Sequence, residues 1–131
     1  MGNIYENLRM TFGDYADDLA DEGVWESEIY APLIFLSINE VEGGISYACD
    51  IHPSDDSEDV AALNKALLAK GYSTDGYGWE EYLSGRFEDN EKLSGVEYDS
   101  ESETCGLFVM DEDSYNQLLA AVSKAIRALL K

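Results

Sequence analysis

Two stretches about 60 residues apart share one pattern, and this pattern constrains the fold more than any other feature of the chain. In both stretches a strand-like run leads into an acid-rich turn and then into an amphipathic helix. They read GGISYACDIHPSDDSEDVAALNKALLA and ETCGLFVMDEDSYNQLLAAVSKAIRAL. A two-stranded hairpin cannot bury an apolar face by itself, so the economical solution packs both units together. We therefore expect an α+β fold: a single antiparallel sheet of four to five strands, with helices packed on one face and two loosely repeated strand-strand-helix units.

Each unit is expected to begin with a hairpin. The first pairs the almost continuously apolar run Ile29–Ile38 with the alternating run Ile45–Ile51, across a loop at Asn39–Gly44. Runs of this length and composition, bounded by glycine and acidic residues, are typical of strands. The second hairpin pairs Val96–Tyr98 with Cys105–Met110 across an acidic turn.

Capping signals indicate where the two main helices begin. The spacing of Asp55 and Glu58 is that of a capping box, and Ser114 and Gln117 repeat it before the last helix. Gly71 is well placed to end the first helix. The last helix has the clearest apolar stripe in the chain. Its members are Tyr115, Leu118, Leu119, Val122, Ile126 and Leu129.

The remaining segments are expected to be shorter or irregular. Weak alternation permits a short strand over Ile4–Phe12, and Asp14–Glu22 has a helical pattern that Asp14 could cap and Gly23 would end. The stretch Tyr72–Gly78 contains two glycines, which predicts an irregular segment before a short helix. That helix would place Trp79, Tyr82, Leu83 and Phe87 in the core.

Charge is the strongest indication of function. The chain has 28 acidic and 8 basic residues, for a formal net charge of -20. Such a surface disfavours direct binding to nucleic acid and to anionic membranes. It favours a basic protein partner, whose association it can accelerate by about 10- to 1000-fold at low salt. Plain solubility is the other interpretation, and composition alone leaves both open.

Length and composition indicate one domain over residues 1–131, with 1–25 as a poorly defined N-terminal segment. No apolar run reaches the ~20 residues of a membrane-spanning helix, and the N-terminus lacks the pattern of a signal peptide. We therefore expect a soluble, cytoplasmic protein. In the cytosol Cys49 and Cys105 would stay reduced and act as small apolar residues. A redox pair is the less favoured alternative, because no Cys-x-x-Cys motif is present.

No pattern in the chain is typical of a catalytic or metal site. His52 lies among carboxylates, but their spacing matches no metal-binding loop. Catalytic triads, phosphate-binding loops and dinucleotide-binding fingerprints are missing from the sequence. We expect no enzyme activity, no cofactor and no metal.

Several segments resemble one protein family. The run Gly76-Tyr77-Gly78-Trp79 precedes a helix, and Tyr98-Asp99-Ser100-Glu101 and Cys105-Gly106-Leu107-Phe108 lead into the closing helix. These features, from about Ile29 to Leu130, resemble the immunity protein 51 family of bacterial polymorphic toxin systems, although the turn here is longer and lacks the proline. The resemblance implies stoichiometric binding and neutralisation of a cognate toxin C-terminal domain, delivered by sibling or rival cells, in the cytoplasm and without catalysis.

The resemblance and the charge together suggest which residues contact a toxin. Acidic residues would attract a basic toxin, such as a nuclease, and would form the rim of the interface. Tyrosines would be buried at its centre as anchors. The candidates are Asp50, Asp55, Asp56, Glu58, Asp59, Glu80, Glu81, Glu88 and Asp89, with Tyr72 and Tyr77 as anchors. The alternative function is an acidic regulator or inhibitor of a housekeeping ribonuclease or another nucleic-acid enzyme.

Overall fold

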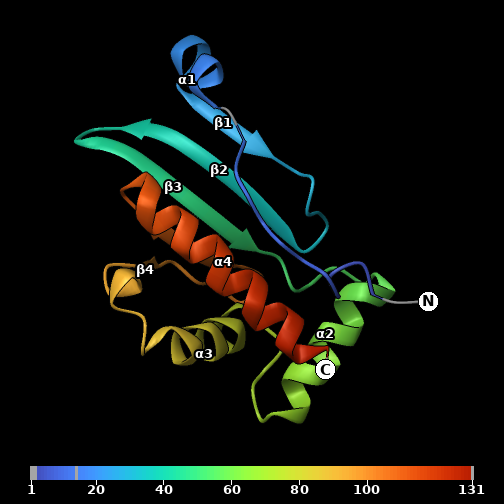
Figure 1. Ribbon diagram of the computed structural model, residues 1–131. Coiled ribbons are helices and arrows are strands. Elements are labelled where there is room, and N and C mark those ends of the chain that lie inside the picture. The colour runs from blue at the N-terminus through green and yellow to red at the C-terminus, as the bar shows by residue number, and fades with distance from the viewer. Residues whose placement is uncertain (1–2, 14, 131) are drawn as a thin grey trace.

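Five strands form one antiparallel sheet in the order β1-β2-β3-β5-β4, and helices pack against it (Figure 1). The computed structural model describes residues 3–13 and 15–130. In chain order the elements are α1 (Ala16–Glu22), β1 (Val24–Ser27), β2 (Ile34–Val41), β3 (Gly44–Ile51), α2 (Glu58–Ala69), α3 (Gly76–Phe87), the 3₁₀ turn η1 (Glu91–Leu93), β4 (Glu97–Tyr98), β5 (Cys105–Val109) and α4 (Glu112–Leu129). The predicted α+β fold is confirmed.

Alternation along the strands separates a core face of the sheet from an open face. On β2 the side chains of Ile34, Leu36 and Ile38 are buried, whereas the residues between them are only half-buried. These three residues pair in register with Ile51, Cys49 and Tyr47 of β3, which are buried on the same side. Cys105, Leu107 and Val109 extend this face across β5.

Helix α4 crosses the core face and contacts both β3 and β5 (Figure 1). Its apolar stripe is fully buried, as the sequence predicts. The Tyr115 hydroxyl donates a hydrogen bond of 2.7 Å to the carbonyl oxygen of Ala48, which satisfies a polar group inside the contact. Helix α3 packs beside α4, where the Tyr82 hydroxyl donates to the Ala125 carbonyl at 2.7 Å.

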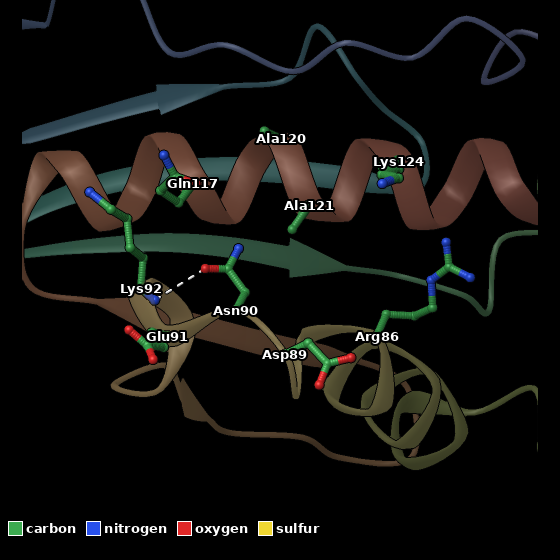
Figure 2. Close-up of a pocket in the computed structure, with 9 residues that line it drawn as sticks. All are labelled: Arg86, Asp89, Asn90, Glu91, Lys92, Gln117, Ala120, Ala121 and Lys124. Atoms are coloured by element: carbon green, nitrogen blue, oxygen red, sulfur yellow. Dashed lines mark hydrogen bonds between the residues drawn. The ribbon is translucent and has the colours of Figure 1, made fainter.

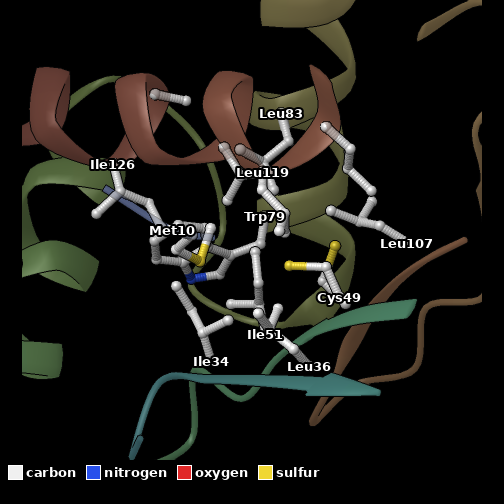
Figure 3. Close-up of a cluster of buried hydrophobic side chains, with 14 of the residues drawn as sticks. Met10, Ile34, Leu36, Cys49, Ile51, Trp79, Leu83, Leu107, Leu119 and Ile126 are labelled. Carbon is white, nitrogen blue, oxygen red and sulfur yellow. The ribbon is translucent and has the colours of Figure 1, made fainter. Parts of the chain in front are cut away.

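The core is one continuous cluster, and Trp79 of α3 lies inside it with no exposed surface (Figure 3). The same cluster contains Met10 of the N-terminal segment, Leu36 of β2 and Leu119 of α4. The indole Nε1–H of Trp79 donates to the Asn64 side-chain oxygen at 2.9 Å, so the polar end of the ring is also satisfied. The predicted core position of Trp79 is confirmed.

Cys49 and Cys105 are buried and free. Burial raises the pKa of both thiols, that of Cys105 to about 12. A thiol with such a pKa is protonated at neutral pH and is a poor nucleophile.

The two strand-strand-helix units share their order but not their packing. Both hairpins form, and β3 of the first pairs with β5 of the second. The strand expected over Ile29–Ile38 begins only at Ile34, because residues 29–33 form turns. Helix α4 covers the centre of the sheet, whereas α2 lies beyond its end (Figure 1). The core face accommodates one long central helix, so the helix of the first unit packs against α4 instead.

The N-terminal segment differs from the prediction. Residues 4–7 form turns and residues 8–13 have no regular secondary structure, so the expected strand over Ile4–Phe12 is wrong. Tyr5, Leu8 and Met10 are buried, and the Met10 backbone N–H donates to the buried Ser123 hydroxyl of α4 at 2.9 Å instead of to a strand. The helix of this region is confirmed as α1, ended by Gly23 at φ 71°. The proposed capping residue, Asp14, lies outside the described residues.

Two further boundaries in the sheet differ from expectation. Strand β1 was not predicted, and it forms an edge of the sheet by pairing Val24–Ser27 with Leu36–Asn39. The expected loop over Asn39–Gly44 is wrong because β2 continues to Val41 and β3 begins at Gly44. Two residues suffice for the turn because Gly43 adopts a φ of 94°, which other residues rarely do.

Both predicted capping boxes are displaced. Ser57, not Asp55, caps α2 by accepting from the Val60 backbone N–H, and Asp55 instead accepts from the Ser57 backbone N–H at 2.8 Å. Asp111, not Ser114, caps α4 by accepting from the Ser114 backbone N–H at 2.7 Å. In both cases the cap is the residue directly before the first helical residue, whose side chain reaches the orphan backbone donors of the first turn.

The glycines of the central stretch belong to a helix, so the irregular segment predicted over Tyr72–Gly78 is too long. Helix α3 begins at Gly76 and is capped by Asp75. A Cβ at Gly76 would lie 2.0 Å from the Glu101 carbonyl oxygen, and one at Gly78 would lie 1.9 Å from that of Ser73. These glycines therefore allow close packing against neighbouring backbone. The expected glycine after α2 is confirmed, since Gly71 follows the capping residue Lys70 with φ 95°.

Candidate protein-binding surface

The face of the sheet opposite α4 is the open face, and no described helix packs on it. Each of α1, α2, α3 and α4 contributes buried side chains to the core on the other face. The strand register places the following residues on the open face: Val24, Glu26, Phe35, Ser37, Asn39, Ser46, Ala48, Asp50, Glu97, Gly106 and Phe108. The open face is therefore the part of the sheet available to a partner.

Two half-buried phenylalanines lie on the open face. Phe35 pairs with Asp50 across β2 and β3, and Phe108 pairs with Ala48 across β3 and β5. Asp50 is thus opposite one ring and diagonal to the other. His52, just after β3, places its ring edge-on to Phe35 with 4.7 Å between the centroids. Aromatic side chains partly buried among polar groups are common at the centres of protein interfaces.

Asp50 is the carboxylate most strongly affected by this environment. Partial burial raises its pKa, Asp99 raises it further, and His52 opposes both effects. Asp99 is close because its backbone packs against Gly106, the residue that pairs with Asp50. Holding a carboxylate where its charged form is disfavoured costs stability, so a cation that approaches this face would be attracted strongly.

A small cavity of about 200 Å³ opens beside Phe35. Its lining includes three carboxylates, those of Glu26, Glu28 and Asp50, together with Ser37. An aromatic ring next to several carboxylates is a favourable environment for a cationic side chain. This arrangement joins β1, β2 and β3 and is not apparent from sequence spacing.

The structure separates the predicted acidic residues into groups. Asp55, Asp56, Glu58 and Asp59 gather at the start of α2. Asp56 and Glu58 are exposed, whereas Asp55 holds the capping turn and Asp59 contacts the N-terminal segment through the Ile4 backbone N–H at 3.4 Å. The exposed members can attract a partner, and the other two also stabilise the fold.

A second group surrounds the start of α3. Glu80 accepts a hydrogen bond of 2.8 Å from the Ser100 hydroxyl in the β4–β5 turn, and Glu81 is exposed. Both Glu80 and Asp50 act electrostatically on the buried Cys105 thiol and raise its pKa. Glu80 therefore lies near the Asp50 end of the open face, although 30 residues separate the two acids in sequence.

Glu88 and Asp89 are exposed at the far end of α3, about 18 Å from its start for a helix of 12 residues. Asp89 lines a groove that also contains basic residues. The structure does not bring these two acids together with Asp50.

The two predicted anchors differ from each other. Tyr77 is 56% exposed in the first turn of α3, so its ring is available to a partner. Tyr72 is half-buried and packs against Tyr82, with 5.5 Å between the ring centroids. Tyr72 therefore belongs in part to the core.

Sequence reasoning missed Phe35, Phe108, Glu26, Glu28 and Asp99 as members of this surface. The alternation along β2 and β5 could have placed both phenylalanines on the face opposite the core. The three acids could not have been found in this way, because β1 was not predicted and the path of the β4–β5 turn depends on contacts with α3.

Within residues 3–13 and 15–130, no three His, Cys, Asp or Glu side chains are grouped so that they could hold a metal ion. None of the helices in the described chain has the length and apolar character that crossing a membrane requires.

Comparison of the chain with family models, with curated proteins and with solved structures found no match.

Proposed function

We propose that the protein is an immunity protein that binds and neutralises a cognate basic toxin domain in the cytoplasm. The observation that carries this proposal is the open face, where Phe35 and Phe108 lie beside Asp50 in a chain of net charge -20. A toxin that acts on nucleic acid needs a basic surface for its substrate, and an acidic protein can occupy that surface. The resemblance to the immunity protein 51 family supports the same conclusion.

Binding would proceed in two steps with different residues. The exposed acids, including Asp56 and Glu58 at the start of α2, would attract the toxin over distances up to the Debye length of about 8 Å at physiological salt. The phenylalanines would then be buried, and a lysine or arginine of the toxin would enter the cavity lined by Glu26, Glu28 and Asp50. A standard interface needs about 800 Å² on each partner, roughly a tenth of the 7451 Å² surface of this chain.

The first experiment is capture combined with rescue. The tagged protein is used as bait in cells that produce the toxin, washed at low and at high salt, and the captured proteins are identified by mass. We expect a basic domain near one-to-one stoichiometry, and we expect co-expression of the protein to restore growth of cells that express this domain. Capture of a housekeeping ribonuclease without rescue would favour the regulator alternative. No capture at either salt would contradict the proposal.

Matched charge variants then locate the interface. One variant carries Glu26→Gln, Glu28→Gln, Asp50→Asn and Asp99→Asn. The control carries Asp17→Asn, Asp18→Asn, Asp21→Asn and Glu22→Gln on α1, all exposed residues next to β1. Each set removes four acids, so both change the formal net charge from -20 to -16.

The two sets should differ in association kinetics. We expect the first to slow association by about tenfold or more at low salt and to flatten its salt dependence, because local charges dominate steering. The α1 set should have a smaller effect. A third set, Asp55→Asn, Asp56→Asn, Glu58→Gln and Asp59→Asn, tests the start of α2. Equal rates for the first set and the α1 control would place the interface elsewhere.

A further inference from the structure

A groove between α3, η1 and α4 gathers basic residues in a chain that has few of them (Figure 2). Its volume is about 790 Å³. Three of its nine lining residues are the basic side chains Arg86, Lys92 and Lys124. With 8 basic residues in 131, nine positions would contain about 0.5 by chance (9 × 8/131). The groove is therefore strongly enriched in positive charge.

Two of the three cations, Arg86 and Lys124, form no ion pair within 4.0 Å among the described residues. Lys92 forms an ion pair with Asp113 at 3.3 Å, and this is the one ion pair within 4.0 Å in residues 3–13 and 15–130. The Arg86 guanidinium instead lies over the Tyr82 ring, 5.9 Å from its centroid. Asp89 and Glu91 also line the groove, so the lining carries three positive and two negative charges, a net of +1 against -20 for the chain.

The directions of the side chains favour an anion in the groove. Figure 2 shows Arg86 and Asn90 reaching toward α4, whereas the Glu91 carboxylate turns away from it. Arg86 and Lys124 lie at one end of the groove, and Lys92 and Gln117 lie at the other. The α4 side between them carries two alanines, Ala120 and Ala121, which leave the groove open.

We propose that this groove binds a small organic anion with two separated anionic groups, phosphate or carboxylate. One group would lie between Arg86 and Lys124, and the other would lie near Lys92. The amides of Asn90 and Gln117 would bind polar atoms between them. The volume falls within the range of about 300–1,000 Å³ that is typical of small-molecule sites.

The net charge decides between a small anion and a larger one. Within about 8 Å at physiological salt, a small ligand responds mainly to the local cations. A nucleic acid or an acidic protein would extend over the rest of the surface and meet its excess of carboxylates. A second copy of the chain would be repelled in the same way, since each copy carries -20. This site is formed by helices away from the open face and does not depend on the proposed function.

The test follows backbone amide shifts by NMR during titration of the whole protein. Fructose 1,6-bisphosphate and citrate are the probes with separated phosphates and carboxylates, and inorganic phosphate is the single-group control. We expect shifts confined to residues 86–92 and 117–124, with either or both probes binding more tightly than phosphate. The stronger probe identifies the preferred anionic group.

Variants test which side chains are responsible. Lys124→Gln should weaken binding, and Arg86→Gln with Lys124→Gln should weaken it at least about tenfold, because two charge-assisted contacts are lost. Lys65→Gln, on the exposed surface of α2, is the matched control and should bind as the wild type does. Lys124→Gln alone keeps the contact between Arg86 and Tyr82, so a loss of binding there is not a loss of folding.

The proposal fails if no amide in the groove shifts at about 10 mM probe, a concentration well above a millimolar Kd. It also fails if the shifts lie elsewhere, or if Lys65→Gln weakens binding as much as Lys124→Gln.

Discussion

Asn64→Leu should destabilise the protein, because Asn64 connects three parts of the fold. Its side-chain oxygen accepts from Trp79 Nε1 on α3 at 2.9 Å, and its side-chain nitrogen donates to the Pro53 carbonyl at 2.8 Å. Leucine has the same γ-branched shape, with bulkier methyl groups in place of the amide, and can make neither bond. Trp79 has no exposed surface, so after the substitution its indole N–H would be buried without a hydrogen-bond acceptor.

The expected magnitude follows from these contacts. Two hydrogen bonds contribute about 1 kcal/mol each, and a buried unsatisfied donor costs about 1–3 kcal/mol. The better helix propensity of leucine offsets a few tenths of a kcal/mol. The free energy of unfolding should therefore fall by about 2.5–4.5 kcal/mol, a large part of the ~5–15 kcal/mol typical of a domain.

Urea unfolding followed by circular dichroism measures this change, with an expected shift of the midpoint by about 1–2 M. Asn116→Leu, at an exposed position of α4, is the matched control and should stay within about 0.5 kcal/mol of the wild type. A double-mutant cycle with Trp79→Phe isolates the hydrogen bond and should give a coupling energy near 1 kcal/mol or more. If Asn64→Leu behaves like Asn116→Leu, the bond does not hold α2 against α3.

Three further predictions concern single residues. Gly78→Ala should destabilise α3, because the new Cβ would lie 1.9 Å from the Ser73 carbonyl oxygen. Gly85→Ala should instead stabilise α3 by about 1 kcal/mol in the same urea assay, because a Cβ there would meet no atom within 4 Å. Burial raises the pKa of Asp50 in the folded protein, so folding becomes less favourable as the pH rises from the ordinary carboxyl range through this raised pKa. Asp50→Asn should therefore be more stable than the wild type above the raised pKa and equally stable below the ordinary carboxyl range, as measured by unfolding at several pH values. Tyr77→Ala should leave stability within about 0.5 kcal/mol, since the ring is 56% exposed, and weaken toxin binding in titration calorimetry; unchanged affinity would remove Tyr77 from the interface.

The Asp50 prediction separates stability from function. If Asp50 is held on the open face for binding, Asp50→Asn should raise stability and weaken association with the toxin together. A variant that gains stability and binds as tightly as the wild type would show that the carboxylate has no part in recognition.

Local pattern was sufficient for the elements whose residues pack in regular alternation. The hairpins around β3 and β5 and the buried stripe of α4 follow from periods of two and of 3.6 residues, which reflect the geometry of each element. Trp79 could likewise be assigned to the core from its spacing with Leu83. These predictions need no knowledge of distant contacts.

The predictions that failed are those that depend on a distant partner. The segment containing Met10 alternates weakly like a strand, but its backbone bonds to Ser123, 113 residues away. Gly76 and Gly78 looked like loop residues, yet they permit contact with the β4–β5 turn and with Ser73. Sequence shows that a glycine is present, but not which backbone approaches it.

The sequence by itself determined the α+β class, the two hairpins, the long amphipathic helix and the excess of negative charge, because composition and short-range periodicity encode all four. Tertiary structure alone decided which charges act together. It placed Asp50 beside Phe35, Phe108 and Asp99 on one face, and it placed Arg86, Lys92 and Lys124 around one groove. Side chains tens of residues apart become neighbours only when strands pair and helices pack, and the chemistry of a surface arises from those neighbours.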